Sequence, residues 1–282
     1  RLQQALAAEW GLRDLHCESA VLRELQPALV EGKRQVTVAI RHDQRIIAVW
    51  PGFKGHLYGI AFDVGSTTVA AHLCDLASGE VVASAGKMNP QIRYGEDLMS
   101  RVSYIMMNPG GEDKLITAVR QAMNELIAEL AEKAEVDLAD IVEITVVGNP
   151  IMQHLVLGIS PVQLGTAPFA LATDSSVDIR AAEIGIHINP GGHVYALPCI
   201  AGHVGADAAG VLLAEAPLAH DGVSLIVDVG TNAELLLGNA ERLLAASSPT
   251  GPAFEGAQIS SGQRAAPGAI ERVRIDPETL EP

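Results

Sequence analysis

Hydrophobic and polar positions alternate with two different periods along this chain. Alternation at every second residue predicts strands at 57–63, 68–75 and 80–85, which tight glycine-containing turns would join into a three-strand meander. Apolar residues spaced three and four positions apart predict a long helix between residues 115 and 130. An apolar strand at 141–147 follows this helix, and strands and helices that succeed one another in this way are typical of the α/β class.

The same pattern divides the chain into parts. A short helix with apolar spacing precedes alternating strands at 36–40 and 45–50, which indicates a small α/β unit at the start of the chain. A second strand meander begins at Val223. We therefore expect a small domain at 1–55 and a larger domain at 56–282, the latter with subdomains at about 56–220 and 221–282.

A short segment of the chain occurs twice. The two copies are Ile60-Ala-Phe-Asp-Val-Gly-Ser-Thr-Thr68 and Leu225-Ile-Val-Asp-Val-Gly-Thr-Asn-Ala233, which share one residue pattern and have similar flanking segments. Each is an apolar strand that ends in Asp-Val-Gly and a hydroxyl residue, and each leads into a second strand, a tight turn and a third strand. The duplication predicts two similar subdomains.

The duplicated strings contain the residue types that bind a phosphate tail. Asp63 and Asp228 end buried strands, where a carboxylate can hold a hydrated Mg²⁺ through oxygen. Gly65 and Gly230 allow the backbone to turn sharply, so that N–H groups and polar side chains surround phosphate oxygens. The side chains expected there are those of Ser66, Thr67, Thr68, Thr231 and Asn232.

A single Asp-x-Gly is most often an ordinary junction between a strand and a turn, but two copies in matching context favour a nucleotide site. The chain has neither a G-x-x-x-x-G-K-S/T loop nor a G-x-G-x-x-G after a strand, so the P-loop and Rossmann interpretations lack their signatures. Glu234 could orient water or bind the metal through water, although a solvent-facing strand residue fits as well. A Gly/Pro-rich loop adds further nucleotide contacts, which we assign to Gly251, Glu255 and Gly256.

Composition narrows the classes of function. The chain has 282 residues, 48% of them hydrophobic, and a net charge of -15 without any cluster of Lys or Arg, so we expect no nucleic-acid partner. Three widely spaced cysteines, Cys17, Cys74 and Cys199, fit a reducing compartment better than a disulfide framework. Neither a membrane span nor a signal peptide is visible, so we expect a cytoplasmic protein without membrane contact. Because the chain starts at Arg1, we interpret it as a fragment.

The duplicated hairpins resemble the two phosphate loops of the ASKHA superfamily, which includes acetate and sugar kinases, heat-shock chaperone ATPases and actin. Four longer strings resemble one branch, the reductive activators of corrinoid proteins. These strings are Tyr58-Gly-Ile-Ala-Phe-Asp-Val-Gly-Ser-Thr-Thr68, Asn89-Pro-Gln-Ile-Arg-Tyr-Gly-Glu-Asp97, Gly148-Asn-Pro-Ile-Met-Gln-His154 and Gly251-Pro-Ala-Phe-Glu-Gly256. The likeness covers most of residues 20 to 275.

The resemblance implies a longer protein with a [2Fe-2S] ferredoxin domain, a linker, a small middle domain and a large ASKHA domain. Residues 1–55 would then belong to the middle domain. The implied activity is ATP-dependent reduction of a Co(II) corrinoid protein of a methyltransferase system to Co(I), with ATP and Mg²⁺ as ligands and a homodimer as the suggested assembly. This chain lacks the C-x4-C-x2-C run of such clusters, so the iron-sulfur centre must lie elsewhere.

Two other functions remain open at this stage. An ASKHA kinase that phosphorylates a small metabolite would need a catalytic base near the γ-phosphate, for which the chain offers only Asp63, Asp228 and Glu234. A nucleotide-dependent assembly module, as among actin relatives, would show weak turnover together with nucleotide-dependent self-association.

Overall fold

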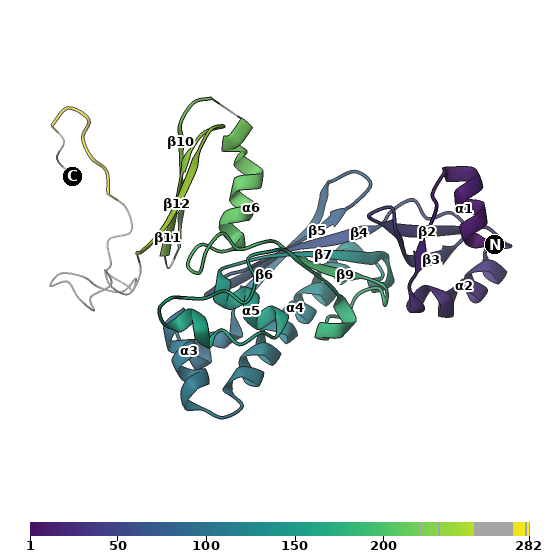
Figure 1. Cartoon of the computed structure of the whole chain (residues 1–282), viewed down its shortest axis with the longest axis horizontal. Helices are drawn as coiled ribbons and strands as arrows, with labels where there is room; N and C mark the ends of the chain where they lie inside the picture. Colours follow the sequence, from purple (N-terminus) through teal and green to yellow (C-terminus); the bar gives the residue numbers. More distant parts are fainter. Residues whose placement is uncertain (220, 231, 251–272, 280, 282) are drawn as a thin grey trace. The chain divides into compact units, whose positions relative to one another are not determined.

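The computed structural model describes residues 1–219, 221–230, 232–250, 273–279 and 281 (Figure 1). The chain separates into two compact units, Arg1–Ala214 and Glu215–Pro282. Each unit contains one of the two Asp-Val-Gly strings.

The first unit begins with a small sheet and two helices. Its strands have the order β1-β3-β2, with β1 parallel and β2 antiparallel to β3. Buried Leu6, Val21, Ile46 and Val49 form a core between the sheet and the helices. The strands predicted at 36–40 and 45–50 are confirmed. The elements are α1 (Leu2–Trp10), β1 (His16–Cys17), α2 (Ser19–Glu31), β2 (Val36–Arg41) and β3 (Arg45–Pro51).

A six-stranded sheet forms the centre of this unit, in the order β6-β5-β4-β7-β9-β8. The predicted meander is confirmed as β4, β5 and β6, and β4 pairs in parallel with β7, which pairs in parallel with β9. The strand bounds are β4 (Tyr58–Val64), β5 (Thr68–Asp75), β6 (Val81–Met88), β7 (Ile141–Val147), β8 (Val177–Arg180) and β9 (His193–Ala196).

The predicted long helix is α4, which packs against β5 and β6. It runs from Gly111 to Ala134 and so exceeds the predicted range, because its polar first and last turns carry no apolar signal. Its face at Leu115, Leu126 and Leu130 is fully buried. The other helical segments are η1 (Pro90–Tyr94), α3 (Leu98–Met107), η2 (Leu138–Asp140), α5 (Pro150–Leu157), η3 (Val162–Gly165), η4 (Ala181–Ile184) and α6 (Ala206–Glu215).

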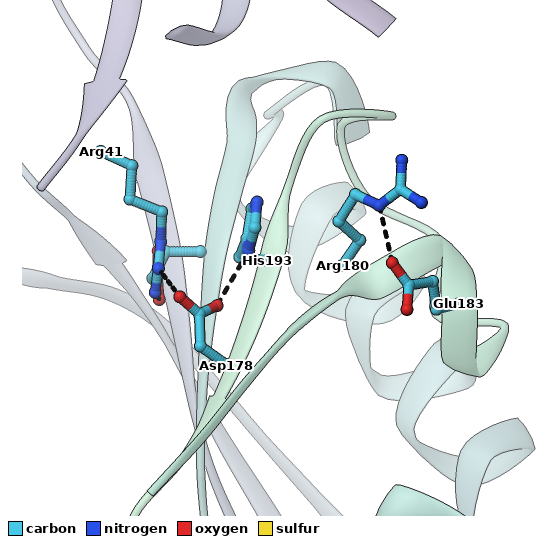
Figure 2. A network of polar contacts seen from close by, with 6 residues as sticks. Arg41, Asp178, Arg180, Glu183 and His193 are labelled. Carbon is cyan, nitrogen blue, oxygen red and sulfur yellow. Dashed lines mark hydrogen bonds and ion pairs between the residues drawn. The ribbon is translucent and has the colours of Figure 1, made fainter. Parts of the chain in front are cut away.

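A polar network joins the small sheet to the large one. The buried Arg41 of β2 donates from Nε and Nη2 to the Glu143 carboxylate of β7, at 2.9 and 2.8 Å, and Arg41 also pairs with Asp178 of β8. Figure 2 shows Asp178 between Arg41 and His193, whose Nδ1 lies 2.9 Å from the carboxylate. The hydrogen bond to Glu143 is the main reason that the pKa of Arg41 is raised, although burial opposes it. The small sheet is therefore fixed to β7 and β8 of the large sheet by a forked contact as well as by apolar packing.

The second unit contains an antiparallel meander in the order β10-β11-β12. Its elements are η5 (Pro217–Ala219), β10 (Ser224–Val229), β11 (Asn232–Gly238) and β12 (Leu243–Pro249). The meander predicted to begin at Val223 is thus confirmed within one residue. Across the described residues of both units, no helix is long and apolar enough to cross a bilayer.

Candidate functional site

The first hairpin places Asp63 near the carboxyl end of an inner strand. In β4, Asp63 pairs with Ala70 of β5 on one side and with Val147 of β7 on the other. Its side chain is exposed, whereas Val64, the last residue of the strand, is fully buried. The apolar neighbours fix the strand, and the carboxylate is left at the rim of the sheet.

The turn after Asp63 requires glycine. A Cβ on Gly65 would lie 2.7 Å from the carbonyl oxygen of Thr68, which is closer than a carbon atom can approach. The turn is therefore tight, and Ser66 is half-buried while Thr67 and Thr68 are exposed. Hydroxyl side chains thus line the outer surface of the turn, next to the Asp63 strand end.

The second hairpin repeats this local arrangement. Asp228 is the penultimate residue of β10, as Asp63 is of β4, and a glycine again opens the turn. The N–H of Gly230 donates to the carbonyl of Asn232 at 2.8 Å, and the Thr250 hydroxyl donates to the carbonyl of Gly230 at 2.6 Å. The turn is held from both sides by its own hairpin.

Asp228 and Glu234 face each other across the second hairpin, as direct partners on β10 and β11. Burial raises the pKa of Glu234 and the Asp228 charge adds to this, while a 3.0 Å hydrogen bond from the Ser247 hydroxyl opposes it. Two half-buried carboxylates side by side repel each other unless a cation or proton lies between them. This donor set fits a hydrated Mg²⁺, which binds one or two carboxylates and completes its shell with water and phosphate.

The predicted site residues fall into three groups. Asp63, Gly65, Ser66, Thr67 and Thr68 lie together on the first hairpin, and Asp228, Glu234, Gly230 and Asn232 lie together on the second. The two hairpins belong to different units of the chain. Four further predicted residues lie outside the described residues, namely Thr231, Gly251, Glu255 and Gly256.

Sequence reasoning missed three buried polar residues that contact the first turn or one another, Asn89, Gln91 and Arg101. Arg101 lies on α3, next to the buried Val102. Asn89 and Gln91 lie in one of the strings that carry the family likeness, whereas the sequence signal for Arg101 is an arginine on the apolar side of a short helix, which resembles a surface arginine.

The three cysteines do not fit an iron-sulfur cluster. Cys17 lies on β1, Cys74 on β5, and Cys199 is buried after β9, and such a cluster needs four ligands. Burial raises the pKa of the Cys199 thiol to about 11, so it is protonated at neutral pH. In the part of the chain that the structure describes, no three His, Cys, Asp or Glu side chains gather as a metal site.

Three family models match the chain in sequence. They describe the RACo linker region at residues 1–56, the RACo middle region at 58–216, and the C-terminal domain of RACo, its ASKHA domain, at 222–282. The middle-region model alone spans more than half of the chain. The predicted α/β ASKHA fold is confirmed by these matches.

Named relatives agree with the family models. The chain is 38% identical over 247 residues to the corrinoid activation enzyme RamQ of Eubacterium limosum, covering 86% of this chain and 41% of that protein. It is 28% identical over 225 residues to the [Co(II) methylated amine-specific corrinoid protein] reductase of Methanosarcina barkeri, covering 76% and 40%.

Among solved structures, a reductive activator for corrinoid, iron-sulfur protein matches with a TM-score of 0.82 and 35% identity, over 98% of this chain and 44% of that one. The chain thus spans less than half the length of each of these relatives. The resemblance stated from the sequence strings is confirmed, and this chain belongs to the RACo family of reductive activators of corrinoid proteins.

Proposed function

We propose that this chain is the ATP-binding core of a reductive activator that drives the reduction of a Co(II) corrinoid protein to Co(I). The observation that carries the proposal is the repeated Asp-Val-Gly hairpin, with its carboxylate near the strand end and its glycine in the turn. It occurs in a chain that RACo models match at residues 1–56, 58–216 and 222–282. The first hairpin brings a carboxylate and hydroxyl side chains together at a tight turn, and the second brings two carboxylates together; such groups can engage a Mg²⁺-bound phosphate tail.

In this proposal each hairpin contacts nucleotide phosphate. Asp63 on the first hairpin and Asp228 on the second are the proposed ligands of hydrated Mg²⁺, and Glu234, beside Asp228, orients water of the metal's shell. The turn residues contact phosphate oxygens on each side, and we assign the loop residues Gly251, Glu255 and Gly256 to further nucleotide contacts. ATP can shift an equilibrium between two conformations only by its differential affinity for them. We infer that the ATP-bound conformation binds the corrinoid protein differently from the ATP-free conformation.

The electrons in this proposal come from a [2Fe-2S] domain outside these residues. A plant-type centre has a potential of roughly -400 mV, and the cobalt couple of this family is expected to lie lower, so the transfer is uphill without ATP. The corrinoid protein of a methyltransferase system is the proposed partner, and we further propose a cytoplasmic protein that forms homodimers and binds neither nucleic acid nor membrane.

The experiment that tests this function is visible spectroscopy of a Co(II) corrinoid protein mixed with the intact activator and a reductant. We expect the Co(I) band to appear with Mg-ATP and to be absent with ATP plus EDTA, because the carboxylates engage the phosphates through the metal.

The methylated amine-specific corrinoid protein, on which the Methanosarcina barkeri reductase acts, is a suitable first substrate. Tight Mg-ATP binding without any ATP dependence of the cobalt spectrum would contradict the activator proposal. That result would favour a metabolite kinase or an assembly module built on the same ASKHA fold.

A further inference from the structure

The first phosphate turn is held from behind by the segment that follows the first meander. Three successive carbonyl groups of the turn accept hydrogen bonds from this segment. The side-chain amide of Asn89 donates to the Gly65 carbonyl at 2.8 Å, and the backbone N–H of Asn89 donates to the Thr67 carbonyl at 2.7 Å. Nη2 of Arg101 donates to the Ser66 carbonyl at 2.5 Å.

The orientation of these carbonyls determines the orientation of the neighbouring N–H groups. In a trans peptide unit, the C=O of one residue and the N–H of the next point in opposite directions. The carbonyls of residues 65 to 67 are directed toward Asn89 and Arg101 on the buried side. The N–H groups of residues 66 to 68 therefore point away from that side. Successive N–H groups with a common direction make an anion-binding concavity.

The supporting side chains are themselves fixed. Asn89, Gln91 and Arg101 are fully buried, and Arg101 also donates to the Gly95 carbonyl at 3.0 Å and to the Gln91 side chain at 3.3 Å. Gln91 in turn donates to the carbonyl of Leu115 on α4 at 2.9 Å. Each of the three side chains takes part in at least two hydrogen bonds, and a satisfied buried network of this kind restrains its members.

Arg101 brings a positive charge directly behind the turn. Burial lowers the pKa of Arg101 to about 10, although the Asp97 charge acts in the opposite direction, so the guanidinium is charged at neutral pH. Its nearest hydrogen-bond acceptors are carbonyl oxygens, a side-chain amide and, at 3.5 Å, the Met152 sulfur. A buried cation whose contacts are neutral dipoles attracts an anion on the other side of the turn more strongly than a surface cation does.

We propose that Asn89 and Arg101 are positioning residues for the first phosphate turn: from the buried side they direct its N–H groups toward the phosphate tail of the nucleotide. This inference rests on the proposed ATP binding by the first hairpin. It also gives a physical role to the string Asn89-Pro-Gln-Ile-Arg-Tyr-Gly-Glu-Asp97, which carries part of the family likeness and contains none of the predicted phosphate ligands. Neither residue touches the nucleotide in this account.

The test is calorimetric titration of the intact protein with Mg-ATP, comparing wild type with Arg101→Lys and Asn89→Ala. Lysine keeps the positive charge but has no fork to reach Ser66, Gly95 and Gln91 together. We expect each variant to raise the Kd for Mg-ATP by about tenfold or more, because the loss of a charge-assisted or buried hydrogen bond usually weakens an interaction by about this factor. The number of sites per folded molecule stays at the wild-type value.

A matched control is Arg120→Lys on α4. Arg120 also donates to a buried backbone carbonyl, that of Val156 at 2.9 Å, and burial also lowers its pKa, but its partner lies away from the turn. We expect this variant to keep the wild-type Kd. A purely structural role for Asn89 and Arg101 would lower the fraction of binding-competent protein and leave Kd unchanged.

The outcomes separate the two proposals. If the wild-type protein binds Mg-ATP and both variants bind it with the wild-type Kd, the positioning role is overturned. An equal rise in Kd in the Arg120→Lys control overturns it as well. No Mg-ATP binding by the wild-type protein overturns the proposed function itself. If Arg101→Lys fails to fold, the Kd of Asn89→Ala decides, since this substitution keeps the buried arginine.

Discussion

Replacing Asp228 with alanine is expected to remove Mg-dependent nucleotide binding while leaving the fold largely intact. The carboxylate stands half-buried near the end of β10, directly opposite Glu234, and its removal takes away a proposed ligand of the hydrated Mg²⁺. We expect Mg-ATP affinity to fall by about tenfold to a hundredfold, because a charge-assisted contact is worth about 1.5–3 kcal/mol. Titration calorimetry with and without Mg²⁺ measures the loss.

The fold survives this change because the two carboxylates repel each other in the absence of a cation. The Asp228 charge contributes to the raised pKa of Glu234, so alanine at position 228 relieves a repulsion as it removes a ligand. A suitable control is Glu241→Ala, which removes an exposed carboxylate from the turn between β11 and β12. Unchanged affinity in Asp228→Ala, or an equal loss in Glu241→Ala, would remove Asp228 from the site.

The second large effect is expected from Gly148→Ala, which should destabilise the support beneath the first hairpin. Gly148 follows β7, with φ of 157°, and a Cβ there would lie 2.7 Å from the carbonyl oxygen of Val64 at the end of β4. Its own carbonyl accepts the N–H of Ala206 at 2.9 Å at the start of α6. Backbone strain and overpacking together should lower the free energy of unfolding by about 2–4 kcal/mol. Urea unfolding at equilibrium measures this.

The control for Gly148 is a glycine with room for a methyl group. A Cβ on Gly86 of β6 would lie 3.5 Å from the Val69 carbonyl oxygen, an ordinary contact. We expect Gly86→Ala to change the free energy of unfolding by less than about 0.5 kcal/mol. A Gly148→Ala protein as stable as wild type would show that the end of β4 can move away, and the close approach would then not constrain the hairpin.

Much of this fold could be predicted from the sequence because its hydrophobic periodicity and its internal repeat are local and strong. The strands β4 and β5 and the helix α4 have uninterrupted periodicity, and the repeat of Asp63-Val-Gly65 at Asp228-Val-Gly230 needs only internal comparison. Glu234 is predicted as a site residue from its position after the second turn, and its pairing with Asp228 follows from the hairpin register.

Other features could not be predicted because long-range contacts create them. The strand β8 has four residues and exists through pairing with β9, and α3 carries exposed methionines that blur its apolar face. Arg101 looks like a surface residue until the fold encloses it behind the turn, 35 residues away from Ser66 in sequence. Buried polar partners of this kind have no periodic signature, so a single sequence does not distinguish them from solvated side chains.

Hydrogen exchange, read by mass spectrometry on the intact protein with and without Mg-ATP, tests the central claim most directly. The claim is that each of the two Asp-Val-Gly hairpins binds the phosphate tail of Mg-ATP. We predict slower exchange of the backbone amides at residues 63–68 and also at 228–232 when Mg-ATP is present, and no slowing with ATP plus EDTA. Protection at only one of these turns, or at neither while ATP is bound, would contradict the account.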